Sequence, residues 1–191
     1  VGSRLIEWPV NHCIKVLSFF HPDDPAALRA EQIDRLRQAY DAARKVGREL
    51  LIEIIAGKNG PLDDTTVSRA LTELYDAGLK PDWWKLEPQA NRRAWAEIDR
   101  VIEARDPFCR GVVLLGLEAP QDVLEQGFAA ARSARTVKGF VNVGIDRRVL
   151  HPHLGVGKVG CWRRVDAFRD RPGDALGDEL VGGEIGQREA D

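Results

Sequence analysis

Short hydrophobic runs alternate along the chain with longer segments in which hydrophobic residues recur every three or four positions. The runs are rich in β-branched and aromatic residues and predict strands over residues 14–20, 49–55, 82–86, 110–117 and 137–143. The longer segments predict amphipathic helices over residues 23–47, 63–79, about 91–105 and about 121–134. Because nearly continuous apolar strands alternate regularly with helices, we expect an α/β fold with a parallel sheet.

Local signals mark where two of these helices begin and end. Asp24 is the expected N-cap of the first helix, and Pro25 suits its first turn. Gly47 and Gly78 are expected to end the first and second helices, because glycine readily adopts the backbone conformation that follows a helix.

Two architectures fit this order of elements: part of a (β/α)8 TIM barrel, and a doubly wound α/β sheet. A complete barrel takes about 250 residues, so 191 residues with about five strands would form a partial one. The sequence contains no methionine. We therefore expect Val1 not to be the natural start, and the chain to be a fragment or one domain of a longer protein.

The chain divides into two parts, with residues 1–150 as the C-terminal part of a barrel domain and residues 151–191 as a tail. The tail loses the helix–strand rhythm and is rich in Gly, Arg and Asp, so we expect it to be weakly structured. Its glycine-rich stretch 155–160 lacks the preceding strand and following helix of a nucleotide site. We hypothesise that the reading frame slips near His153.

Composition excludes several classes of function. With 43% hydrophobic and 30% charged residues the chain resembles a soluble globular protein, and its net charge of −2 does not indicate a nucleic-acid partner. No apolar run reaches the roughly 18 residues of a membrane-spanning helix, and the N-terminus does not resemble a signal peptide. Three widely spaced cysteines predict neither disulfides nor a zinc site and fit a cytoplasmic setting. We expect no metal and no organic cofactor.

Charged residues interrupt the hydrophobic runs on successive predicted strands. They are Lys15, Glu53, Lys85 with Glu87, and Lys138. A charge inside a covered strand is costly unless it is paired or takes part in chemistry. Several such charges predict a shared polar site near the carboxyl ends of the strands, where α/β folds place their chemistry.

A buried lysine beside a buried carboxylate suits Schiff-base catalysis. Desolvation and a neighbouring cation lower the pKa of a lysine, so Lys85 beside Lys15 would be available as a neutral amine. Glu53 would move protons while the iminium forms. The alternative is a set of buried ion pairs without a catalytic task. His21 is a candidate for substrate contact, and the alternative is a helix-cap cluster with Asp23 and Asp24.

Four motifs carry a family resemblance: "WPVNHCIKVLSFFHPDDP", "ELLIEIIAGKNGP", "PDWWKLEP" and "CRGVVLLGLEAP". In order and spacing they resemble the aldolase-like domain of unknown function that follows the sugar kinase in bacterial 5-dehydro-2-deoxygluconokinases of myo-inositol catabolism. The resemblance covers roughly residues 1–144. That domain is similar to the tagatose-bisphosphate aldolase family, which are class I aldolases on a TIM barrel.

The resemblance implies a role for each charged strand residue. Lys85 would be the Schiff-base lysine on the sixth barrel strand, Glu53 the acid/base on the fifth, and Lys15 a substrate-contacting cation on the fourth. The implied reaction cleaves 6-phospho-5-dehydro-2-deoxygluconate to dihydroxyacetone phosphate and malonate semialdehyde. In the family three βα units precede these strands, so we expect little turnover from this chain alone.

The expected substrate-binding set also includes His21, Glu87, Gly116, Gly144 and Arg147, with Gly116 and Gly144 at the ends of the last two strands, where barrels often bind phosphate. The family's phosphate-binding turn "GFAVGR" reads "GFVNVGIDRRVL" here, so the glycine is kept and the arginine is displaced. The implied partners are a phosphorylated sugar substrate and an N-terminal sugar kinase domain. Barrel aldolases often associate, but no interface can be identified. The alternative function is a non-catalytic module that binds a sugar phosphate and regulates a kinase.

Overall fold

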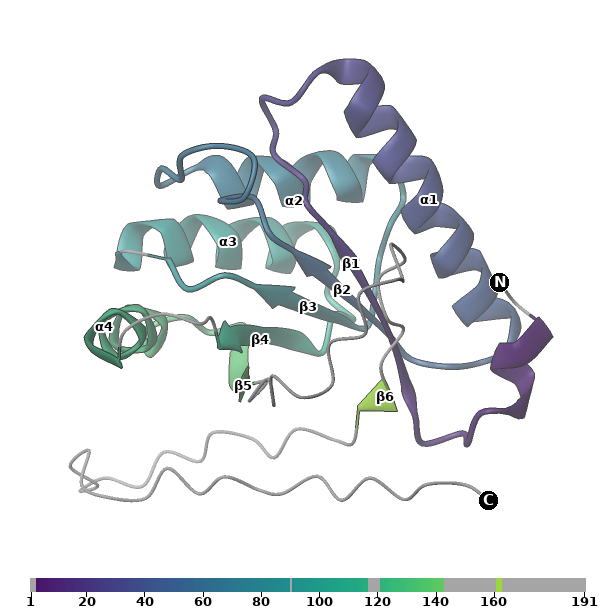
Figure 1. Ribbon diagram of the computed structural model, residues 1–191. Helices are drawn as coiled ribbons and strands as arrows, with labels where there is room; N and C mark the ends of the chain where they lie inside the picture. Colours follow the sequence, from purple (N-terminus) through teal and green to yellow (C-terminus); the bar gives the residue numbers. More distant parts are fainter. Residues whose placement is uncertain (1–2, 90, 117–120, 143–160, 163–191) are drawn as a thin grey trace, which may run out of the picture.

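The computed structural model describes residues 3–89, 91–116, 121–142 and 161–162. Within them a short 3-10 helix, η1 (Ser3–Glu7), precedes a six-stranded sheet that alternates with helices (Figure 1). The strands are β1 (Cys13–Ser18), β2 (Leu50–Ile54), β3 (Trp83–Leu86), β4 (Gly111–Gly116), β5 (Val137–Asn142) and β6 (Cys161–Trp162). The helices are α1 (Ala26–Lys45), α2 (Thr66–Asp76), α3 (Arg92–Arg105) and α4 (Gln121–Ala131).

The strand order decides between the two expected architectures. Strands β1 to β5 are parallel, and each lies beside its predecessor in the sequence. The helices α1 to α4 lie on the outer side of the curved sheet (Figure 1). A doubly wound sheet would reverse its strand order at a switch point and cover both faces with helices. The arrangement is therefore an open α/β sheet of the kind that makes up part of a barrel.

The edge of the sheet next to β1 was not predicted. There β6 pairs antiparallel with β1, with Cys161 opposite Ile14 and Trp162 opposite Cys13. This two-residue strand comes from the segment that we expected to be weakly structured. The remainder of 151–191, including the expected frame slip near His153, lies outside the described residues.

Alternation along the strands gives the sheet two different faces. On the helix side Ile52 and Trp84 are fully buried and pack in one core with Leu74 of α2 and Trp95 of α3. The intervening positions face the other side of the sheet, which corresponds to the inside of a barrel. The charged residues of β1, β2 and β3 occupy that inner face.

The predicted helix ends are confirmed in two cases and wrong in one. Gly47 and Gly78 follow α1 and α2 with φ of 63° and 81°, a backbone conformation that glycine adopts without strain. The N-cap of α1 is Pro25, and Asp24 does not cap it. The Asp24 carboxylate instead accepts hydrogen bonds from His21 N at 3.1 Å and from Asn59 Nδ2 at 2.8 Å. It therefore joins two loops.

The core contains one buried polar contact whose removal has a measurable cost. Trp84 Nε1 donates to the Tyr75 hydroxyl at 2.7 Å, and the two rings pack edge to face. Tyr75→Phe leaves the indole N–H without this acceptor, so we expect a loss of about 1–3 kcal/mol in unfolding free energy. Urea unfolding measures this loss. The control is Tyr40→Phe, which removes the hydroxyl of the half-buried tyrosine of α1. Equal midpoints for the two variants would contradict the expectation.

Features that bear on membranes and metals can be stated for the described residues alone. None of the described helices is both long enough and apolar enough to cross a membrane. The described residues also contain no group of three or more His, Cys, Asp or Glu side chains arranged to hold a metal ion. Cys109 is a free thiol.

Candidate active site

Three charged side chains from adjacent strands meet on the inner face of the sheet. Glu53 of β2 lies directly opposite Lys85 of β3, and Lys85 Nζ is 3.3 Å from Glu53 Oε1. Lys15 of β1 makes an ion pair with the other oxygen, Oε2, of the same carboxylate. The exposed fractions of the side chains are 14% for Lys15, 2% for Glu53 and 3% for Lys85. One buried carboxylate therefore lies between two ammonium groups.

The electrostatics of this cluster act mainly on Lys85. Burial lowers the pKa of the Lys85 amine, the charge of Glu53 raises it, and the charge of Lys15 lowers it again, with a net lowering. Since the cluster holds two cations and one anion, loss of one proton leaves a balanced pair. A lowered pKa makes more of the amine neutral near neutral pH, and the neutral amine is the form that attacks carbonyl groups.

Glu87 follows β3 directly, two residues after Lys85. Its carboxylate is buried, and Oε2 accepts a hydrogen bond from Gly57 N at 2.9 Å. Burial raises the pKa of Glu87, and the neighbouring Glu53 charge raises it further, while backbone N–H groups of the loop after β2 and the His21 charge oppose the change. Glu87 thus interacts electrostatically with both Glu53 and His21.

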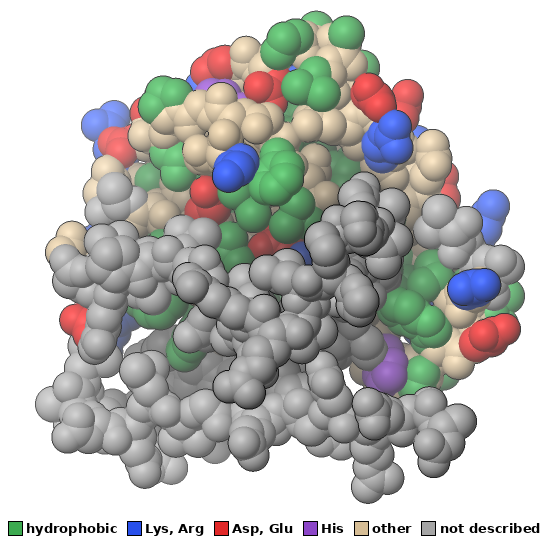
Figure 2. Space-filling model, in the orientation of Figure 1, with side chains coloured by type: hydrophobic (Ala, Val, Ile, Leu, Met, Phe, Trp, Pro, Cys, Tyr) green, Lys and Arg blue, Asp and Glu red, His purple; other side chains and the backbone are tan. Residues whose placement is uncertain are grey.

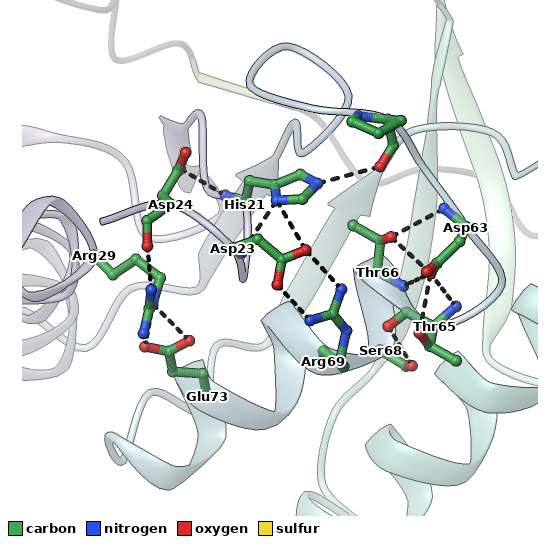
Figure 3. A network of polar contacts seen from close by, with 11 residues as sticks. His21, Asp23, Asp24, Arg29, Asp63, Thr65, Thr66, Ser68, Arg69 and Glu73 are labelled. Carbon is green, nitrogen blue, oxygen red and sulfur yellow. Dashed lines mark hydrogen bonds and ion pairs between the residues drawn. The ribbon is translucent and has the colours of Figure 1, made fainter. Parts of the chain in front are cut away.

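His21 lies in the loop after β1 and is 5% exposed. Its Nδ1 accepts a hydrogen bond from Asp23 N at 3.2 Å, so Nε2 carries the proton in the neutral ring and donates to Pro61 O at 3.2 Å. Both ring nitrogens are thus occupied by backbone groups (Figure 3). His21 therefore contacts the loop residues Asp23 and Asp24, and substrate contact by its ring would require one of the two ring bonds to break.

A polar network joins the loop after β1 to the start of α2 (Figure 3). Asp23 forms two hydrogen bonds with Arg69 of α2, and these bonds lower the pKa of its carboxyl. Asp63 accepts from the backbone N–H groups of Thr65 and Thr66 at 2.7 Å, and hydrogen bonds from Thr66 and Thr65 hold its pKa far below the ordinary value. Asp63 therefore holds the turn that leads into α2, whose N-cap residue is Thr65.

These loops enclose a pocket of about 310 Å³. It is lined by His21, Asp23, Asp24, Asn59, Gly60, Pro61, Leu62, Asp63 and Thr66. Exposed hydrophobic side chains lie nearby in the sequence, namely Leu17, Phe19 and Leu62. Figure 2 shows hydrophobic side chains gathered near the middle of the visible face, with acidic and basic side chains beside them. The edge at which β1 and β2 end therefore combines an acidic pocket with exposed apolar surface.

The other residues expected in the site have different outcomes. Gly116 is the last residue of β4, as expected for a backbone donor at the carboxyl edge of the sheet. Lys138 is exposed, and its Nζ donates to Arg135 O at 2.8 Å, so it does not join the charged cluster. Gly144 and Arg147 lie outside the described residues.

Sequence reasoning missed the part played by the loop 55–65. Gly57 and Pro61 contribute backbone groups that contact Glu87 and His21, and neither was named as a site residue. The signal was present in "AGKNGP", since a run of Gly, Asn and Pro directly after a buried strand indicates a tightly turned loop. It did not say which side chains the loop would touch.

Comparison with known proteins places residues 1–151 within one family model, described as "Uncharacterized protein conserved in bacteria (DUF2090)". No curated protein matches the chain. Among solved structures, the crystal structure of Cgl0159 from Corynebacterium glutamicum (Brevibacterium flavum) is similar, with 19% sequence identity and a TM-score of 0.44. The match covers 68% of this chain and 41% of that one, so this chain spans less than half of its length.

Proposed function

The chain belongs to the bacterial DUF2090 family, and we propose that its sheet supports class I aldolase chemistry on a phosphorylated keto-sugar acid. The observation that carries the proposal is the contact between the buried amine of Lys85 and the carboxylate of Glu53, with Lys15 as a second cation. The substrate that we propose is 6-phospho-5-dehydro-2-deoxygluconate, by the sequence resemblance given above.

The proposed reaction begins at the ketone. The neutral Lys85 amine adds to the ketone carbon, and loss of one water gives an iminium. A base removes the proton from the hydroxyl on the β carbon, the bond between the α and β carbons breaks, and malonate semialdehyde leaves. The bonding electrons move into the iminium and form an enamine. Protonation of the α carbon and addition of one water release dihydroxyacetone phosphate and restore the amine.

Glu53 is the group that we propose for proton transfer in these steps. Its Oε1 lies 3.3 Å from Lys85 Nζ, so it is close to the oxygen that must leave as water when the iminium forms. Lys15 contacts the same carboxylate, and its charge helps to keep the Lys85 amine neutral. Lys15 is also the cation that we propose for contact with the negatively charged substrate.

The distribution of charge favours one end of the carboxyl edge for the phosphate group. The pocket after β1 and β2 is lined by Asp23, Asp24 and Asp63, and these carboxylates repel an anion. We therefore propose that the phosphate binds near Gly116 at the end of β4, where backbone N–H groups can donate to it. Gly144 and Arg147 belong to the proposed phosphate-binding set by the sequence resemblance alone.

The extent of the described sheet bears on activity. A closed barrel of this kind has eight parallel strands, and the described residues supply five. We expect slow or no turnover unless three further βα units complete the barrel.

A sugar kinase domain is the partner that we propose, because a kinase would supply the phosphorylated substrate. We also propose a cytoplasmic location, as expected from the three widely spaced cysteines of the sequence.

Borohydride trapping tests the proposal. The protein is incubated with dihydroxyacetone phosphate, reduced, digested and analysed by mass spectrometry. We expect a stable adduct on the peptide that contains Lys85, because reduction converts an iminium into a secondary amine. The same experiment on a chain extended by three βα units separates the chemistry of the lysine from the completeness of the barrel.

Each result of the trapping experiment has a definite meaning. An adduct on Lys85 in either chain supports the aldolase. No adduct in either chain refutes the proposed chemistry and leaves the Lys85–Glu53 contact as a structural ion pair. In that case, retained binding of the sugar phosphate would favour the alternative of a non-catalytic module that regulates a kinase.

A further inference from the structure

The loop 55–65 between β2 and α2 is held on two sides by buried ionisable side chains. On one side Gly57 N donates to Glu87 Oε2 at 2.9 Å. On the other side His21 Nε2 donates to Pro61 O at 3.2 Å. Strand β2 lies between β1 and β3 in the sheet. Glu87 directly follows β3 and His21 follows β1, so the loop after β2 is held from both neighbouring strands.

The two glycines of this loop lie directly against those side chains. A Cβ atom on Gly57 would come within 2.8 Å of Glu87 Oε1, and a Cβ atom on Gly60 would come within 2.9 Å of His21 Nε2. Carbon atoms do not approach oxygen or nitrogen so closely without repulsion. The loop is therefore packed against both side chains, with no room for a substituent between them.

The use of a carboxylate for this contact is costly. Glu87 is 7% exposed, and the Glu53 carboxylate of the proposed reaction centre repels its charge. Burying a charged acceptor for this N–H group lowers the stability of the fold more than burying a neutral acceptor would. Glu87 also lies two residues after Lys85. The contact that holds the loop is therefore close in the chain to the reactive amine.

We propose that Glu87 is a positioning residue that fixes the loop 55–65, through Gly57, at the carboxyl edge beside Glu53 and Lys85. This inference rests on the proposed function. The loop supplies Asn59, Gly60 and Pro61 to the pocket wall, and Glu87 sets their place relative to the reactive lysine. Glu87 does not transfer a proton in the reaction. Its carboxylate acts by accepting the hydrogen bond from Gly57 N in the loop.

The difference between positioning and proton transfer can be measured with two substitutions. In Glu87→Gln the amide oxygen can still accept from Gly57 N, so a positioning role is largely preserved. In Glu87→Ala the acceptor is lost. Gly57→Ala is the complementary change, since it keeps the carboxylate and pushes it away from the loop. Glu97→Ala on α3, where Glu97 pairs with Arg100 on the surface, is the matched control.

Two measurements on these variants test the proposal. Hydrogen exchange of the peptide over 55–65 reports the hold on the loop. Borohydride trapping at increasing dihydroxyacetone phosphate concentration gives a half-saturating concentration and a limiting rate. We expect Glu87→Ala and Gly57→Ala to speed exchange and raise the half-saturating concentration by about tenfold each, the factor that corresponds to one hydrogen bond to a charged group. The limiting rate should change less, and Glu87→Gln and Glu97→Ala should resemble the wild type.

Other results would overturn the positioning role. If Glu87→Gln loses the limiting rate as fully as Glu87→Ala does, Glu87 takes part in proton transfer. If Glu87→Ala and Gly57→Ala exchange at the wild-type rate, Glu87 does not hold the loop. If neither the wild type nor the chain extended by three βα units forms an adduct, the proposed function fails, while faster exchange in both variants still supports the hold of Glu87 on the loop.

Discussion

Replacement of Lys85 by methionine is expected to abolish the borohydride-stable adduct and to lower cleavage by at least about a thousandfold, which corresponds to about 4 kcal/mol in the barrier. Methionine cannot form an iminium, and it fits a site in which the lysine side chain is 3% exposed. Glu53 keeps its ion pair with Lys15 in this variant, so the remaining charges stay paired. Adduct formation is measured in this chain, and cleavage in a chain with three added βα units.

Lys15→Met is the matched control for that experiment, because Lys15 contacts the same carboxylate from the other side. We expect the adduct on Lys85 to persist. The positive charge of Lys15 lowers the pKa of Lys85, so its removal should move the midpoint of the trapping rate to higher pH. An adduct that survives Lys85→Met, or one that maps to Lys15 in the wild type, would show that the reactive amine has been assigned to the wrong strand.

Much of this site follows from simple regularities of the sequence. Alternation places Lys15, Glu53 and Lys85 between hydrophobic neighbours on three consecutive strands, and parallel order brings consecutive strands together. Strands β1 to β5 were predicted within two residues of their observed ends. The register between neighbouring strands could not be predicted, because it depends on how whole strands pair. Glu53 lies directly opposite Lys85, whereas its partner position on β1 is Leu17, two residues beyond Lys15.

Two polar side chains in loops show why contacts between distant segments could not be predicted. Asp24 was assigned to a helix cap on local grounds, but its carboxylate accepts from Asn59, 35 residues away. The ring of His21 is satisfied by Pro61, 40 residues away. A polar side chain in a loop can bond to many different partners. The fold, and not the neighbouring sequence, determines which partner lies within hydrogen-bonding distance.

The cost of assembling the cluster leads to the second large effect, which is on stability. Glu53→Gln preserves the shape of the side chain and removes the one negative charge between Lys15 and Lys85. Breaking a buried ion pair by removing one partner costs about 3–5 kcal/mol, because the remaining charges are left buried without compensation. We expect a loss of this size in unfolding free energy near pH 7. Urea unfolding measures it, and Glu97→Gln, which alters an exposed pair on α3, should change stability by less than about 0.5 kcal/mol.

The pH dependence of that loss distinguishes an electrostatic cause from a packing defect. The pKa of Lys85 is already lowered in the folded protein, and removal of Glu53 takes away the charge that raises it. The folded-state pKa of Lys85 is therefore lower still in Glu53→Gln, and between the two folded-state values the folded variant binds fewer protons than the folded wild type, so the stability of the variant rises more steeply with pH. The deficit of Glu53→Gln relative to wild type should therefore shrink as the pH rises through this interval. A deficit that stays constant over this range would mean that Glu53 stabilises the sheet through its shape and hydrogen bonds rather than through its charge.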